Sequence, residues 1–145
     1  NVEAMTRILA ATTANEPTPV SVHLQAAELR ELQQIVRGVL CGSHLLRFVA
    51  ELLLATHPEA EQVDDRTRRF VRYGASARAG QAIVLGAKAR ALLAGRPAVV
   101  KADLEACVLP ALQHRVLLGF EADAERIQVR DLTQSWLERA ERRSK

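Results

Sequence analysis

The chain has 145 residues, of which 48% are apolar and 26% are charged, proportions that exclude a disordered or fibrous chain. Alanine and leucine occur 24 and 20 times while aromatic residues make up only 3%, a mixture that favours helices over strands. The net charge of +3 is too small to indicate nucleic-acid binding by itself, and no apolar run approaches the roughly 20 residues of a membrane span. We therefore expect an all-α fold, a small helical bundle.

The first part of the chain predicts one short helix and a break. Residues 3–11 favour a helix. Pro17 and Pro19 exclude a helix at their positions, because proline lacks the amide proton that a helix interior needs. An extended stretch at 20–22 is expected to follow.

Two amphipathic helices are predicted next, over 26–40 and 44–57. Apolar or small side chains recur on one face of each helix: Leu29, Leu32, Val36 and Val39 in the first, and Leu45, Val49, Leu52 and Thr56 in the second. Gly42 and Ser43 form the turn between them. Short turns join antiparallel neighbours, so we expect these two helices to pack side by side.

The charged residues 59–75 are predicted as an irregular loop. Ser76 then suits the N-cap position of a long helix over 77–94, which Gly95 ends. The helix has two sides. Its polar side carries Arg78, Gln81 and Lys88, and the side predicted to face the core carries Leu85, Ala89 and Leu92.

Two further helices complete a predicted bundle of six. The first covers 102–114 and contains Pro110, which is expected to bend or divide it. The second covers 129–142, after a loop around Gly119 and Phe120. Their inward residues are predicted to be Leu104, Val108 and Leu112 in the first, and Leu132, Trp136, Leu137 and Ala140 in the second. A minor two-stranded pairing of residues 99–100 with 20–22 stays open.

The sequence lacks the common motifs of self-contained enzymes. It has no P-loop, no glycine-rich dinucleotide motif, no HExxH and no GxSxG. Its four histidines have no partner at the spacing of metal ligands, so we expect no metal site. Cys41 and Cys107 lack a CxxC spacing and are expected to be small buried thiols.

The strongest functional pattern is the run Tyr73-Gly74-Ala75-Ser76-Ala77-Arg78. A glycine permits a turn, Ser76 caps a helix, and Arg78 lies in the first turn of that helix. Free backbone amides and the positive end of the helix dipole attract an anion, and a guanidinium beside them adds charge-assisted hydrogen bonds, so phosphate is the expected ligand. In the alternative interpretation, Arg78 only pairs with Asp64, Asp65 or a carbonyl at a helix end.

From Arg72 to about Glu125 the sequence resembles the C-terminal lid domain of the MoxR-type AAA+ ATPases. The segments that carry the resemblance are RYGASARAG, KARALLAGR, PALQHR and GFEADAE. The family usually reads RYGASPR, so Ala77 stands where a proline is common. Upstream, PVSVHLQAAELRELQQIVRGV is similar to the earlier helices of the lid, with Gln25 where a serine is usual.

The resemblance implies that Arg78 is the sensor 2 arginine, which reaches the terminal phosphates of ATP, with Ser76 and Ala75 beside the nucleotide. The ATPase core, which binds Mg²⁺, would precede this chain. Residues 1–15 would then be the segment that follows the core, and residues 16–145 the lid. The lid alone is not expected to hydrolyse ATP.

The family also implies partners and a location. These are the core of the same chain, neighbouring subunits of a hexameric ring, a von Willebrand A-type partner protein, chaperone-like activity on partner complexes, and the cytoplasm. No role is implied for the His114-Arg115 pair.

Two other classes of function stay open. The basic cluster of Arg66, Arg68, Arg69 and Arg72 could dock nucleic acid, although acidic residues adjoin it and aromatic residues that stack on bases are scarce. A helical adaptor that binds a protein independently of nucleotide is the other alternative.

Overall fold

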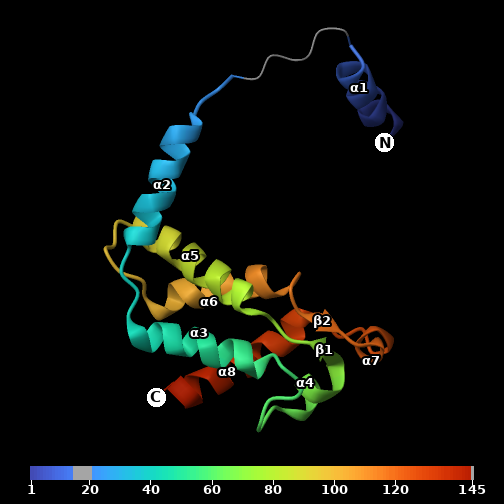
Figure 1. The fold of residues 1–145 in the computed structure, drawn as a ribbon. Coiled ribbons are helices and arrows are strands. Elements are labelled where there is room, and N and C mark those ends of the chain that lie inside the picture. The colour runs from blue at the N-terminus through green and yellow to red at the C-terminus, as the bar shows by residue number, and fades with distance from the viewer. Residues whose placement is uncertain (15–20, 145) are drawn as a thin grey trace. The chain divides into compact units, whose positions relative to one another are not determined.

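The computed structural model describes residues 1–14 and 21–144 and confirms the all-α fold. Its helices are α1 (Val2–Thr12), α2 (Ala26–Gly38), α3 (Ser43–Ala55), α4 (Asp65–Phe70), α5 (Ala77–Leu93), α6 (Lys101–Leu112), α7 (Phe120–Ala124) and α8 (Val129–Ser144). The strands β1 (Val71–Tyr73) and β2 (Leu117–Leu118) form one antiparallel pair (Figure 1). All six predicted helices are present. In the described ranges, no helix has the length and apolarity needed to cross a membrane.

The chain divides into two compact units, residues 1–32 and 33–145, each of which is described by itself. In the first unit Asn1 caps α1, its side-chain oxygen accepting a hydrogen bond from the amide of Ala4 at 2.9 Å. Leu29 and Leu32 at the start of α2 are each 47% exposed, so the predicted apolar face is not a core face there. Pro17 and Pro19 lie outside the described residues, as does Val20 of the open strand pairing.

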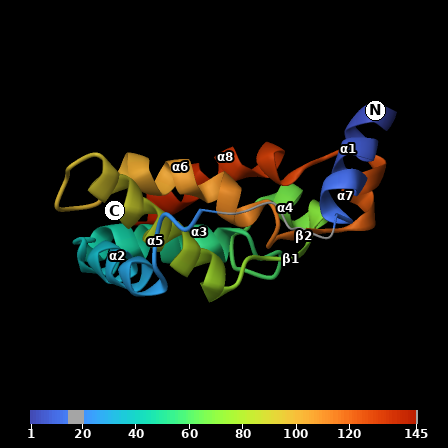
Figure 2. The same ribbon diagram turned by 90° about the horizontal axis from the view of Figure 1, so that it is seen from above.

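The core of the second unit is built from α3, α5, α6 and α8. The predicted inward faces of α3 and α6 are confirmed, and Leu52, Leu104, Val108 and Leu112 are fully buried. In α8 Leu132, Trp136 and Ala140 are buried as predicted, whereas Leu137 is half-buried. The helix α3 packs along α8 and against α5 (Figures 1 and 2).

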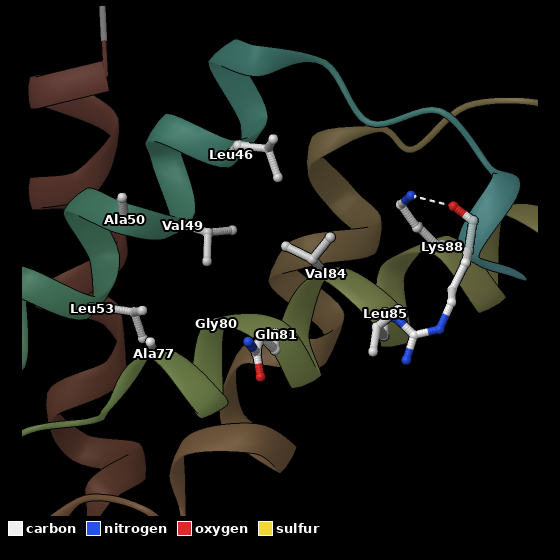
Figure 3. A pocket seen from close by; sticks show the side chains of 11 residues that line it. Leu46, Val49, Ala50, Leu53, Ala77, Gly80, Gln81, Val84, Leu85 and Lys88 are labelled. Atoms are coloured by element: carbon white, nitrogen blue, oxygen red, sulfur yellow. Dashed lines mark hydrogen bonds between the residues drawn. The ribbon is translucent and has the colours of Figure 1, made fainter. Parts of the chain in front are cut away.

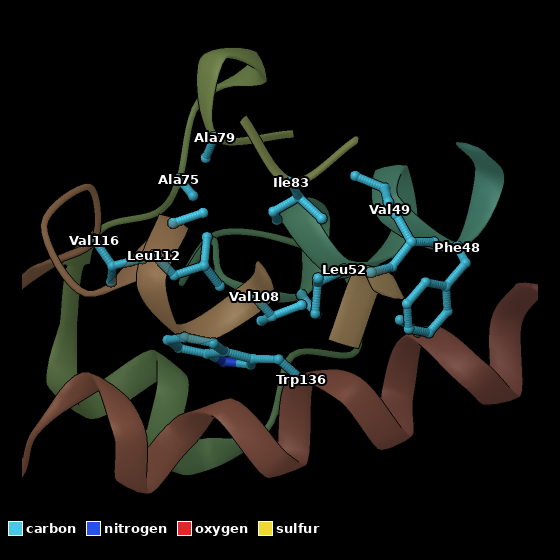
Figure 4. Packing of buried hydrophobic residues seen from close by; sticks show 14 of the residues in the cluster. Phe48, Val49, Leu52, Ala75, Ala79, Ile83, Val108, Leu112, Val116 and Trp136 are labelled. Atoms are coloured by element: carbon cyan, nitrogen blue, oxygen red, sulfur yellow. The ribbon is translucent and has the colours of Figure 1, made fainter. Parts of the chain in front are cut away.

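The predicted core face of α5 is wrong. Leu85 and Ala89 are only half-buried and Leu92 is exposed, while the fully buried positions are Ala79, Ile83, Ala87 and Ala91. Figure 4 shows Ala79 and Ile83 in the core. The helix α5 packs mainly against α6 and also against α3. A Cβ atom on Gly80 would come within 2.8 Å of a methyl group of Leu53 in α3, and one on Gly86 within 2.9 Å of Sγ of Cys107 in α6, so small residues are needed at these two contacts.

The predicted loops around 59–75 and Gly119 are partly wrong, because they contain α4, the β1–β2 pair and α7. Asp64 caps α4, accepting a hydrogen bond from the amide of Thr67 at 2.8 Å. Thr67 and Phe70 of that helix are buried. The pair joins Val71 to Leu118, so the minor strand pairing exists between segments other than those considered. Residues 98 and 40 form only an isolated parallel bridge.

The glycine after α5 ends that helix as predicted, whereas the proline inside α6 does not divide it. Gly95 has φ of +68° and ends α5, with the amides of Gly95 and Arg96 donating to the carbonyls of Leu92 and Ala91. Pro110 does not divide α6, which continues to Leu112. The helix therefore ends two residues after its proline.

Asp103 fixes the start of α6. Its carboxylate is buried and makes two hydrogen bonds of 2.7 Å with the guanidinium of Arg96, and it accepts a third from the amide of Val100 at 3.0 Å. The hydrogen bonds, those with Arg96 most of all, favour the charged carboxylate more strongly than burial disfavours it. They therefore lower the pKa of Asp103 to about 2. The charged form of Asp103 therefore stabilises the fold.

We expect Asp103→Asn to destabilise the protein near neutral pH and to lose this effect in acid. Because the pKa is lower in the folded state than the ordinary 3.8, the stabilisation is complete above that value and disappears as the pH falls through about 2. Urea unfolding midpoints of both proteins at several pH values measure the difference. The exposed Asp65→Asn variant is the control. A difference that does not change with pH would contradict the prediction.

Candidate functional site

The predicted phosphate-binding run lies in the turn between β1 and α5. The centre of this turn is Ala75, which is buried and bound at both of its backbone groups to the end of α3. Its amide donates to the hydroxyl oxygen of Thr56 at 2.8 Å. Its carbonyl oxygen lies 3.1 Å from Nε2 of His57, which makes that nitrogen the donor. The end of α3 thus holds the turn that leads into α5.

Gly74 is required for space and not for a left-handed backbone. A Cβ atom at this position would come within 2.7 Å of Cγ of His57 and 2.8 Å of the carbonyl oxygen of Thr56. Among the glycines of the described ranges, only Gly95 has a positive φ. Gly74 therefore permits the turn because its backbone can approach the end of α3 closely, and not because it adopts a left-handed conformation.

Ser76 occupies the predicted N-cap position of α5, but its side chain makes no capping hydrogen bond. The amide of Ala79 instead donates to the backbone carbonyl of Ser76 at 2.9 Å. The hydroxyl of Ser76 is exposed at the start of the helix. It is therefore available to another partner.

Arg78 lies exposed in the first turn of α5. Across residues 1–14 and 21–144 its side chain has no hydrogen bond and no ion pair, so the alternative pairing with Asp64 or Asp65 is not formed. Asp64 uses its carboxylate to cap α4. An unpaired guanidinium thus stands next to the positive end of a helix dipole, an arrangement that suits an anion.

An open groove of about 570 Å³ runs between α3 and α5 beside this turn (Figure 3). Its walls are mainly apolar side chains, with Leu46, Val49 and Leu53 from α3 and Val84 and Leu85 from α5. Gln81 and Lys88 of the predicted polar side also line it. At one end, Nζ of Lys88 donates to the carbonyl oxygen of Arg37 at 2.7 Å and fixes the last turn of α2.

The basic cluster at 66–72 is partly neutralised by its neighbours. Arg69 forms ion pairs with Glu121, at 2.6 Å, and with Glu125. Arg66 donates to the carbonyl oxygen of Asp131, and the guanidinium of Arg72 stacks over the ring of Tyr73 at 5.5 Å from its centroid. Among the described residues, the acidic side chains thus pair with one of the four arginines of the cluster, Arg69.

The histidines and cysteines were the other candidates for metal or redox chemistry. No group of three or more His, Cys, Asp or Glu side chains in the described part of the chain is arranged to hold a metal ion. The free thiols of Cys41 and Cys107 are half-buried, and burial raises the pKa of both. His114 contacts the adjacent Arg115.

The roles of Thr56 and His57 do not follow from the sequence. Thr56 is predicted on the inward face of its helix, and His57 has no partner at the spacing of metal ligands, but nothing in the spacing of either residue relates it to residue 75. A threonine among leucines on a buried face was the available signal, because a buried hydroxyl needs hydrogen-bond partners.

Comparison with known proteins places these features in context. Residues 63–136 match the family model described as the AAA lid domain. Over 105 residues the chain is 31% identical to chaperone MoxR1 of Mycobacterium tuberculosis, covering 72% of this chain and 28% of that protein. A crystal structure of a Cytophaga hutchinsonii protein, provisionally described as an ATPase, is similar with a TM-score of 0.75 and 25% identity, covering 96% of this chain and 42% of the other. The chain thus spans less than half of either relative.

Proposed function

The chain belongs to the AAA lid domain family, and on that premise we propose that it is the lid of an ATPase whose nucleotide-binding core precedes residues 1–15. Residues 16–145 then form the lid that closes over ATP. The observation that carries the proposal is Arg78, an exposed and unpaired arginine in the described ranges, at the start of a helix whose first turn has no acidic residue.

Arg78 acts in this proposal as the sensor 2 residue. When the lid closes, its guanidinium donates charge-assisted hydrogen bonds to the terminal phosphate of ATP, and the dipole of α5 favours the same negative charge. Ser76 and Ala75 border the nucleotide from the turn. The positive charge of Arg78 also stabilises the negative charge that develops on the phosphate oxygens as the bond to the leaving group breaks. Mg²⁺ is held by the core.

The wider assembly follows from the family. We propose a ring of such ATPases, six subunits in the typical case, in which each lid contacts its own core and a neighbouring subunit. The similarity to a protein named as a chaperone supports chaperone-like activity in assembling partner complexes. A von Willebrand A-type partner protein and a cytoplasmic location belong to the same proposal.

The proposal predicts that the full-length protein hydrolyses ATP in the presence of Mg²⁺ and that residues 1–145 alone do not. The lid alone has the guanidinium of Arg78, but in this proposal the groups that bind Mg²⁺ and orient the attacking water belong to the core. Phosphate release by the two purified proteins measures this, with circular dichroism verifying that the lid is helical. Hydrolysis by residues 1–145, or a full-length protein that neither binds nor hydrolyses ATP, would overturn the proposal.

A further inference from the structure

Two residues at the end of α3 hydrogen-bond to one residue, Ala75, in the turn before α5. Thr56 accepts a hydrogen bond from the amide of Ala75, and His57 donates one to the carbonyl oxygen of the same residue. The hydroxyl of Thr56 is itself oriented, since it donates to the carbonyl oxygen of Leu53 at 2.7 Å. Thr56 and Ala75 are essentially inaccessible to solvent. Water therefore cannot readily replace these bonds if they are lost.

The strand β1, which leads into the turn, is fixed independently of Thr56 and His57. The strand β1 is held by β2, and the amide of Gly119 donates to the carbonyl oxygen of Phe70 at 2.8 Å. The α5 helix begins only two residues after Ala75, at Ala77, and Arg78 follows. The backbone of Ala75 thus sets where α5 begins and the direction in which it leaves the turn. Arg78 has no side-chain partner in the described ranges that could position it instead.

We propose that Thr56 and His57 are positioning residues that act through Arg78. They lie on a different helix, and they fix the backbone from which the guanidinium of Arg78 reaches the phosphate. This inference rests on the proposed function of Arg78. A shift of the start of α5 by about 1 Å would misplace the guanidinium, and misplacements of that size lower turnover by up to roughly a hundredfold.

The test compares variants of the full-length protein in steady-state ATP hydrolysis. Thr56→Val keeps the shape of the side chain and removes the hydroxyl, whereas Thr56→Ser keeps the hydroxyl. We expect Thr56→Val to lower kcat about tenfold with a change in KM below about threefold, and Thr56→Ser to stay within about twofold of the wild type. His57→Phe should lower kcat in the same way, and His57→Gln, which keeps a donor, should restore part of it.

Thr133→Val is the matched control for losing a buried hydroxyl. Thr133 lies in α8, and its hydroxyl donates only to the carbonyl oxygen of Val129 at 2.9 Å. We expect this variant to leave kcat unchanged within about twofold, since its hydrogen bond is internal to one helix. If Thr133→Val lowers kcat as much as Thr56→Val does, the effect is a general loss of stability and the inference is wrong.

The double variant Thr56→Val/Arg78→Ala separates positioning from other roles. If Thr56 acts through Arg78, Thr56→Val causes no further loss of kcat once Arg78 is removed. If Thr56→Val lowers kcat equally with and without Arg78, the inference is overturned. It is also overturned if Arg78→Ala lowers kcat while Thr56→Val has wild-type kinetics. Wild-type kinetics of Arg78→Ala itself would instead overturn the proposed function, and the inference with it, so the two failures are distinguishable.

Discussion

Replacing Arg78 with alanine in the full-length protein is expected to lower kcat for ATP hydrolysis by about a hundredfold while the fold stays intact. In the proposed function, the guanidinium stabilises negative charge on the terminal phosphate. No other charged side chain of this turn can replace it, so the loss is expected to be large. The stability should hardly change, since Arg78 is exposed and has no hydrogen bond or ion pair within the described ranges. Phosphate-release kinetics and thermal unfolding measure the two quantities.

Two further variants make this experiment specific. Arg78→Lys keeps the positive charge but lacks the planar fork of donors, so it should recover only part of the turnover. Arg90→Ala removes an exposed arginine from the same helix, about 18 Å farther along its axis, and should leave kcat unchanged. Unchanged kinetics of Arg78→Ala, or equal losses in the variants at 78 and 90, would rule out the sensor role of Arg78.

Trp136→Ala is expected to have the largest effect on stability, about 3–5 kcal/mol of the free energy of unfolding. Trp136 is fully buried in the core, together with Leu52 and Val108 (Figure 4). Its indole nitrogen donates to the hydroxyl oxygen of Thr67 at 2.7 Å, and the hydroxyl of Thr67 donates to the carboxylate of Asp64. Alanine would therefore leave a cavity and also remove the link from α8 to α4.

Urea unfolding of residues 1–145 measures the change. Leu93→Ala is the control, because Leu93 is 88% exposed and its truncation should change stability by less than about 0.5 kcal/mol. Trp136→Phe keeps part of the ring volume but no donor for Thr67, and should fall between the alanine variant and the wild type. A loss below about 1 kcal/mol for Trp136→Ala would show that the cavity collapses or that the core lies elsewhere.

The long amphipathic helices were predictable because their apolar periodicity is set by the same core that buries them. Leu104, Val108 and Leu112 are an example, since four-residue spacing on α6 sufficed to identify its buried face. The turn that carries Arg78 was predictable for a different reason. Its serine, glycine and arginine are adjacent in sequence, so their proximity requires no tertiary information.

Features that depend on contacts between distant segments were not predictable. The six residues of α4 show little periodicity, and the two residues of β2 acquire their structure by pairing with β1. On α5 the hydrophobicity of Leu85 and Leu92 suggested the wrong face, because only the packing of α5 against α6 and α3 shows which side is buried. The bonds from Thr56 and His57 to Ala75 likewise join residues 19 and 18 positions apart.

The packing of α3 along α8 has a practical consequence for fragments of this domain. The family match covers residues 63–136, yet α3 ends before that segment and the last two turns of α8 follow it. A fragment trimmed to the match would uncover the sides of α5 and α8 against which α3 packs, and it would lose Ala140 at the end of α8. It would also lose Thr56 and His57, which hold Ala75. The segment matched by the family model is thus shorter than the packed unit, and expression boundaries should include α3 and all of α8.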